Sequence, residues 1–118
     1  DDMRINIHDM FEGGILDRFI FDELEKNRSY YNDISKVDFI NYYEVSQSML
    51  ADFNQFLESF NIRHDNKISS KPVIQTYLKA TIARQLFDSN LAYKIIAKKD
   101  DMILKTFDYN TQKISLNP

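Results

Sequence analysis

Two histidine–carboxylate pairs are the first residues whose types could support chemistry. His8 precedes Asp9 and His64 precedes Asp65, and the chain has two histidines in all. A metal site of two histidines and one carboxylate would require the two pairs to meet in space. Both pairs stand in polar segments, which favours solvent-exposed side chains. We therefore expect no metal and no cofactor at these positions.

A second cluster combines serine with lysine, the residue types of a Ser–Lys catalytic dyad. Lys67, Ser69, Ser70 and Lys71 lie close together in the sequence. A serine nucleophile needs an activating base in a dry pocket and donors for the oxyanion. This segment is instead polar and leads into Pro72, a residue that suits the first turn of a helix. Capping of that helix accounts for Ser70, so we expect no catalysis here.

The remaining polar patterns lack a catalytic signature. Clustered carboxylates such as Asp22, Glu23 and Glu25 are typical of a solvated helix face. The Gly13-Gly14 pair lacks the later glycines and the lysine of a phosphate-binding loop. The sequence contains no cysteine, which excludes thiolate metal sites, disulfides and a cysteine nucleophile. We expect this chain not to be an enzyme.

Arg84 is the charged residue with the most unusual place, between Ile82 and Leu86 on the most apolar predicted helix. It has two interpretations. As a structural arginine, its stem packs in the core and its head reaches a carboxylate or a helix C-terminus. As a binding residue, its fork of donors captures the terminal carboxylate of a peptide. The structural interpretation is the simpler of the two.

Two adjacent tyrosine pairs stand near the middle of the chain. Tyr30-Tyr31 and Tyr42-Tyr43 flank a short, partly helical segment. Tyrosine combines a large apolar ring with a polar tip, so it serves equally at the rim of a core and in a protein contact surface. Both interpretations remain open for all four residues.

Composition predicts the fold class that must position these residues. The chain has 118 residues, of which 43% are hydrophobic and 14% aromatic, enough for one well-packed core. Two glycines and two prolines are too few for the frequent turns of a β-sandwich or barrel. The net charge of −3 provides no basic field for nucleic acid. We expect one all-α domain.

The hydrophobic period predicts a compact bundle of about five helices with short links. Leu16, Phe19 and Ile20 share one face of the first helix, which Gly13-Gly14 interrupts. Good N-caps precede several of the others. Residues 109–118 form a polar tail, either a frayed end or the start of a further segment. The expected helices cover residues 5–31, 47–60 after Ser46, 71–87 after Ser70, 90–99 after Ser89 and 101–107 after Asp100, with a brief turn capped by Ser35 within 34–43.

The sequence has the character of a fragment. No stretch reaches the ~20 apolar residues of a membrane span. The chain opens with Asp1-Asp2-Met3, without an initiator methionine or a signal peptide. We therefore expect residues 1–118 to be a single helical domain cut from a larger protein.

One segment resembles a known family of proteases. Residues 77–87, Tyr-Leu-Lys-Ala-Thr-Ile-Ala-Arg-Gln-Leu-Phe, are similar to a helix in the C-terminal helical region of carboxyl-terminal processing (tail-specific) serine peptidases of Bacteroidetes type. In that family an Ala/Tyr-Tyr-Lys helix, an acidic cap and a final helix come next. Residues 92–96, Ala-Tyr-Lys-Ile-Ile, and 100–103, Asp-Asp-Met-Ile, resemble those parts.

The resemblance extends upstream and keeps its order. Residues 43–53 resemble an extended Glu-Val that leads into a capped helix, and residues 14–19 resemble the glycine-led entry of the first helix. The match thus covers about residues 7 to 107. The sequence departs from the family at Phe87-Asp88, where Trp-Gly is more frequent, and at Lys98-Lys99, which is unusual for that turn.

The resemblance implies a non-catalytic C-terminal accessory domain. In this family the PDZ module and the catalytic core, with its Ser–Lys dyad, lie outside the matched region, so no catalytic residue carries over. The implied partner is the rest of the same polypeptide, on which the domain docks to shape substrate access or to aid oligomerisation. The implied location is the periplasm or cell envelope, and the parent's substrates are proteins or peptides.

A different class of function remains open beside the accessory domain. The chain is alternatively an independent helical module that binds proteins or peptides in a groove between helices. Such a site would be a concave apolar pocket with Arg84 or a lysine at its mouth. An accessory domain would instead leave part of its apolar surface uncovered when alone, and could self-associate through it.

Overall fold

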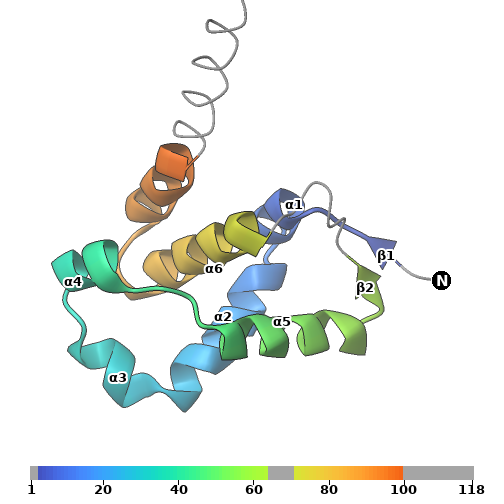
Figure 1. Ribbon diagram of the computed structural model, residues 1–118, viewed down its shortest axis with the longest axis horizontal. Helices are drawn as coiled ribbons and strands as arrows, with labels where there is room; N and C mark the ends of the chain where they lie inside the picture. The colour runs from blue at the N-terminus through green and yellow to red at the C-terminus, as the bar shows by residue number, and fades with distance from the viewer. Residues whose placement is uncertain (1–2, 64–70, 100–118) are drawn as a thin grey trace, which may run out of the picture.

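The fold is all-α, as the sequence predicts. The computed structural model describes residues 3–63 and 71–99 (Figure 1). The last described element is a helical segment over residues 89–99. The labelled elements are β1 (Met3–Arg4), α1 (Ile7–Glu12), α2 (Ile15–Lys26), α3 (Arg28–Asp33), α4 (Lys36–Tyr42), α5 (Gln47–Ser59), β2 (Ile62–Arg63) and α6 (Lys71–Leu86).

The described residues contain seven helices rather than about five. The first predicted helix is divided in three, and the brief turn predicted within residues 34–43 is the helix α4, while the predicted helix over 101–107 lies outside the described residues. Gly14 has φ of 90°, a left-handed conformation that glycine adopts without strain, and it separates α1 from α2. Asn27 leaves helical geometry at φ −123° and ψ 35°, which separates α2 from α3. The interruption at Gly13-Gly14 was predicted; a separate helix after Asn27 was not, because the first helix was expected to end within this segment.

Local capping determines where several helices begin. The hydroxyl of Ser35 accepts a hydrogen bond from the backbone N–H of Asp38 at 3.1 Å, and that of Ser46 accepts one from Met49 at 3.0 Å. Both caps were predicted. Asn61, with φ of 55°, follows α5 in the left-handed conformation that asparagine tolerates at helix ends. The predicted cap Ser70, the predicted helix after Asp100 and the tail at 109–118 lie outside the described residues.

We expect Ser46→Ala to destabilise the protein by about 1 kcal/mol, because it removes the acceptor for an otherwise unpaired N–H at the start of α5. The free energy of unfolding from urea titrations measures the loss. Ser48→Ala is the matched control: Ser48 is exposed inside the same helix, and its replacement should be neutral or slightly stabilising. Equal losses in the two variants would contradict the capping role.

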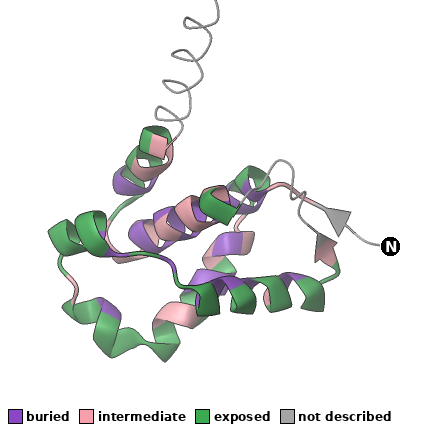
Figure 2. Cartoon of the chain, viewed as in Figure 1, coloured by how far each residue is buried: buried purple, intermediate pink, exposed green. Residues whose placement is uncertain are grey.

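Helix α6 is the central element of the core. It packs against α1 and α2 and has the largest number of buried residues among the labelled helices. Figure 2 shows its buried surface facing into the molecule. The small residues Ala80 and Ala83 are fully buried, so neighbouring helices approach closely there. The buried hydroxyl of Thr81 donates a hydrogen bond to the carbonyl of Tyr77 at 2.8 Å, so this hydroxyl has a partner inside the core.

A short parallel pairing joins two distant segments at one end of the fold. Met3 pairs with Ile62 and Arg4 with Arg63, which places β1 beside β2 (Figure 1). The pairing is too short to change the fold class. Among the described residues, no helix has the length and apolar character required to cross a bilayer.

The helical segment at 89–99 begins at a cap that the sequence analysis placed one residue too late. The carboxylate of Asp88, rather than Ser89, accepts the hydrogen bond from the backbone N–H of Leu91, at 2.7 Å. Lys36 of α4 forms an ion pair with the same carboxylate at 3.2 Å. A carboxylate is favoured over a hydroxyl here because it satisfies the helix N-terminus and also pairs with a cation.

We expect Asp88→Ser to lose a pH-dependent part of the stability. The backbone hydrogen bond from Leu91 and the interaction with Lys36 hold the pKa of Asp88 below its ordinary value of 3.8. A lowered folded-state pKa means that the charged form stabilises the fold above pH 3.8, and that this contribution disappears as pH falls through the folded-state pKa. Urea titrations at neutral and acidic pH should show the wild-type advantage shrinking in acid; a constant difference would contradict it.

Candidate functional site

The four tyrosines predicted as a core rim or contact surface divide into two buried and two exposed residues. Tyr31 and Tyr43 are buried, and their hydroxyls lie 3.0 Å apart in a hydrogen bond between α3 and the segment after α4. Burial raises the pKa of both hydroxyls, and the negative charge of Glu23 raises it further. Both side chains are therefore neutral and serve to hold α3 against the end of α4.

The other two tyrosines, Tyr30 and Tyr42, are exposed to solvent next to this buried pair. Tyr42 is 77% exposed and Tyr30 is 56% exposed, and the ring of Tyr30 meets that of Tyr31 edge-on with centroids 5.1 Å apart. Between α3 and α4 the surface has a groove of about 520 Å³, within the range of protein ligand sites. Its lining residues are Tyr30, Asp33, Ile34, Asp38, Tyr42 and Tyr43, which we call the tyrosine groove.

The tyrosine groove is acidic. Asp33 and Asp38 line it, and neither forms an ion pair with any residue in the described ranges. The two basic residues of α3 and α4 are already engaged elsewhere: Arg28 with Glu25, and Lys36 with Asp88. The groove thus combines aromatic faces with two carboxylates and has no cation in its lining.

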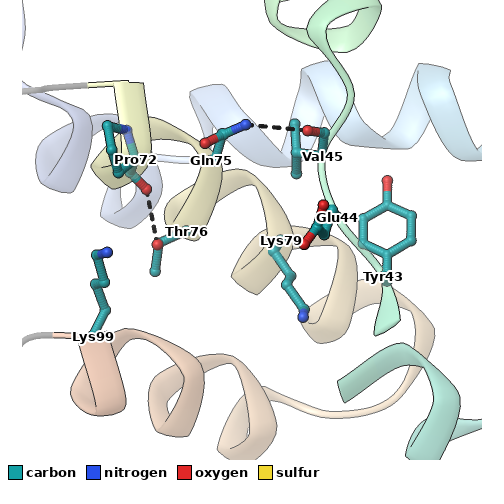
Figure 3. Close-up of a pocket in the computed structure, with 8 residues that line it drawn as sticks. All are labelled: Tyr43, Glu44, Val45, Pro72, Gln75, Thr76, Lys79 and Lys99. Atoms are coloured by element: carbon teal, nitrogen blue, oxygen red, sulfur yellow. Dashed lines mark hydrogen bonds between the residues drawn. The ribbon is translucent and has the colours of Figure 1, made fainter. Parts of the chain in front are cut away.

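A second hollow, of about 320 Å³, lies between α6 and the segment that follows α4 (Figure 3). Its wall is fixed by polar contacts: Gln75 donates to the carbonyl of Val45 at 3.2 Å, and the hydroxyl of Thr76 donates to the carbonyl of Pro72 at 2.9 Å. The residues lining this hollow are Tyr43, Glu44, Val45, Pro72, Gln75, Thr76, Lys79 and Lys99.

The lysine at this second hollow has a structural partner. The ammonium of Lys79 donates to the carbonyl of Ile40 at 3.1 Å and lies 5.5 Å from the centre of the Phe39 ring. Burial lowers the pKa of Lys79, and the nearby Glu44 opposes that shift. The ammonium of Lys79 is therefore already bound to the backbone of α4 and is less available to a ligand in this hollow.

Arg84 lies in neither cavity. Its guanidinium forms an ion pair with Asp17 of α2 at 2.9 Å and donates to the carbonyl of Phe11, at the end of α1, at 3.2 Å. The same group stacks over the Phe11 ring at 3.9 Å from its centre. Gln85 adds a hydrogen bond to the carbonyl of Asp17 at 2.8 Å. These contacts tie α6 to α1 and α2, and the Nε and Nη2 donors of Arg84 already bind the Asp17 carboxylate.

The candidate histidines and serines lie only partly within the described residues. His8 contacts Tyr77, with its ring nitrogen 3.1 Å from the tyrosine hydroxyl, while His64 and the serines Ser69 and Ser70 lie outside the described residues. Within residues 3–63 and 71–99, no three histidine, aspartate or glutamate side chains are placed to hold a metal ion.

Comparison with known families gives one match. The model of DUF8443, a family of unknown function, matches residues 7–88, which is more than half of the chain. The chain belongs to this family. Neither a curated protein nor a solved structure matches it. The DUF8443 region spans α1 to α6 and ends at Asp88, so it contains the tyrosine groove and the Arg84–Asp17 pair.

Sequence analysis missed the acidic half of the tyrosine groove within the DUF8443 region. Asp33 and Asp38 were not singled out, and nothing in their spacing placed them in one groove with Tyr30 and Tyr42. A usable signal was present: two carboxylates lie between the two tyrosine pairs, in a segment with one lysine.

Proposed function

We propose that this chain is a non-catalytic C-terminal accessory domain of a cell-envelope carboxyl-terminal processing serine protease. Its role is to dock on the protease core, where it aids oligomerisation or substrate access. The observation that carries the proposal is the ordered resemblance of residues 7–107 to the helical region of that family. By the same resemblance, the location is the periplasm or cell envelope.

Placement of the resembling segments in one packed unit supports this proposal. The segment at 77–87 lies mainly on α6, and six of its residues are buried. Segment 14–19 begins α2, which packs against α6, and segment 43–53 includes the start of α5. Several of the matched residues therefore form the core, as is expected of a domain whose function is to keep a shape rather than to perform chemistry.

An uncovered apolar surface also supports docking. Large hydrophobic side chains are exposed at several positions, and four of these lie on α3 and α4. Exposed apolar side chains that gather on one surface are typical of interaction sites. The exposed residues are Phe21, Tyr30, Val37, Ile40, Tyr42, Phe60 and Tyr93.

The second candidate function is an independent helical module that binds proteins or peptides. The tyrosine groove favours it, because a concave site with aromatic walls suits a short peptide as well as a docking partner. The expected participation of Arg84 does not favour it, since Arg84 lines neither hollow and contacts Asp17.

The mass of the native protein that carries this sequence separates the two candidates. An antibody against the chain should detect, in an envelope fraction, a product several times larger than 14.0 kDa, and intact mass should place a protease core in the same polypeptide. A native product near 14.0 kDa would overturn the accessory-domain proposal and make the independent module the leading function.

A further inference from the structure

We propose that the tyrosine groove binds an arginine-bearing segment of the protease core, an inference that rests on the proposed function and names the chemistry of its partner. The guanidinium of the arginine would lie against the exposed rings of Tyr30 and Tyr42 and meet the carboxylates of Asp33 and Asp38. The charge of the groove, its aromatic walls and the surrounding surface each support this partner.

Charge complementarity identifies the partner as a cation. Asp33 and Asp38 line the groove without an ion pair among the described residues, and Glu23 adds to the negative field that acts on Tyr31 and Tyr43. No residue of the lining is basic. Two uncompensated carboxylates in a concave surface attract a positive group and repel an acidic one.

The aromatic walls favour arginine over lysine. A guanidinium is planar, stacks on aromatic faces and donates two parallel hydrogen bonds to a carboxylate, whereas an ammonium is a compact and strongly hydrated point charge. The chain already shows this preference: Arg84 combines an ion pair with Asp17 and stacking over Phe11 at 3.9 Å. The tyrosine groove offers the same two kinds of contact, with no side chain of the described chain filling them.

The surrounding surface suits a protein segment rather than a free small cation. Val37 is 64% exposed and Ile40 is 40% exposed, and both lie on α4, the helix that also carries Asp38 and Tyr42 of the groove. Exposed apolar side chains on the same helix add contact area that a protein partner uses and a small ion does not. The buried hydroxyl pair of Tyr31 and Tyr43 fixes the two walls relative to each other, so little ordering is required on binding.

Titration of the 118-residue chain with a short peptide tests the inference. The probe is a capped pentapeptide whose only charge is that of one central arginine, and the control replaces that arginine with citrulline, which has nearly the same shape but no charge. Amide shifts in two-dimensional NMR spectra report the site. We expect the arginine peptide to shift the amides of residues 30–43 and to bind about tenfold more tightly than the citrulline peptide.

Matched variants assign the effect to the groove. Asp33→Asn with Asp38→Asn removes both charges and keeps the side-chain size, and should weaken binding about tenfold. Asp52→Asn with Glu58→Gln makes the same change in net charge on the exposed face of α5 and should leave binding intact. Tyr42→Phe should retain binding, while Tyr42→Leu, at a position too exposed to affect folding, should weaken it several-fold.

Three results would overturn the inference. One is equal binding of the arginine and citrulline peptides, and another is equal weakening by the groove variant and the α5 variant. The third is a concentration-dependent shift of residues 30–43 without peptide, which would assign the groove to a second copy of the chain. A native product near 14.0 kDa with retained arginine binding would remove the protease core as partner, whereas a large product without arginine binding would remove only the groove's role.

Discussion

Phe39→Ala should destabilise the protein by about 3–5 kcal/mol, the largest loss expected from a single substitution discussed for this chain. Phe39 is fully buried. Its ring stacks on Tyr43 with centroids 4.9 Å apart and meets Phe87 edge-on at 5.6 Å, so it joins α4 to the segment that follows α6. Alanine would leave a cavity at this junction and remove both ring contacts.

Urea denaturation measured by circular dichroism would give the loss in the free energy of unfolding. The matched control is Val37→Ala on the same helix, where the side chain is exposed and truncation should change stability by no more than about 0.5 kcal/mol. Because domains of this size are stable by about 5–15 kcal/mol, Phe39→Ala should remove a large fraction of the total. A loss as small as that of the control would show that α4 does not depend on this ring.

The same variant has a consequence for the tyrosine groove. Tyr42 and Asp38 are carried by α4, and Phe39 is the buried residue that fixes this helix to the core. Lys79 strengthens the attachment through its hydrogen bond to Ile40. We therefore expect the groove to lose its shape before the contacts among α1, α2 and α6 are lost.

Arg84→Ala should destabilise the fold by about 2 kcal/mol, the second largest expected effect. The substitution removes the ion pair with Asp17, the hydrogen bond to the carbonyl of Phe11 and the stacking over the Phe11 ring. The Arg84 side chain is 18% exposed and that of Asp17 is 41% exposed, which places the pair between a buried and a surface ion pair. The expected loss of stability therefore lies between the loss typical of a surface ion pair and that typical of a buried one.

A double-mutant cycle with Asp17→Asn isolates the ion pair from the remaining contacts. The matched control is Arg18→Ala, which removes an exposed arginine from α2, 5.7 Å from the ring of Phe60, and should cost no more than about 0.5 kcal/mol. The arginine-peptide titration of a folded Arg84 variant should be unchanged, because Arg84 does not line the groove. Loss of peptide binding with full stability would instead assign Arg84 to a binding site.

Local rules in the sequence determined the secondary structure of much of the described chain. The hydroxyls of Ser35 and Ser46 cap α4 and α5 as predicted, and Asn61 follows α5. The glycine pair interrupts the first helical stretch as predicted, and α6 is the most buried labelled helix. These features depend on a few neighbouring residues and on the spacing of apolar side chains along one helix, so they can be predicted from the sequence.

Contacts between distant residues were decided by the tertiary structure. Tyr31 and Tyr43, twelve residues apart, meet in the core, while their neighbours Tyr30 and Tyr42 face the solvent; the residue types are the same, so composition could not separate them. In the sequence, nothing separates Asp17 from the other acidic residues. The packing of α2 on α6 places it against Arg84.

The tyrosine groove, the candidate site, is also a feature that the tertiary structure decides. The sequence by itself determined that the chain is all-α and where several helices begin. Only the packing of α3 beside α4 gathered two tyrosines and two aspartates around one groove. The physical reason is that hydrogen-bonded caps and helical period act over a few residues, whereas a groove depends on the angle between helices, which the shapes of all the packed side chains set together.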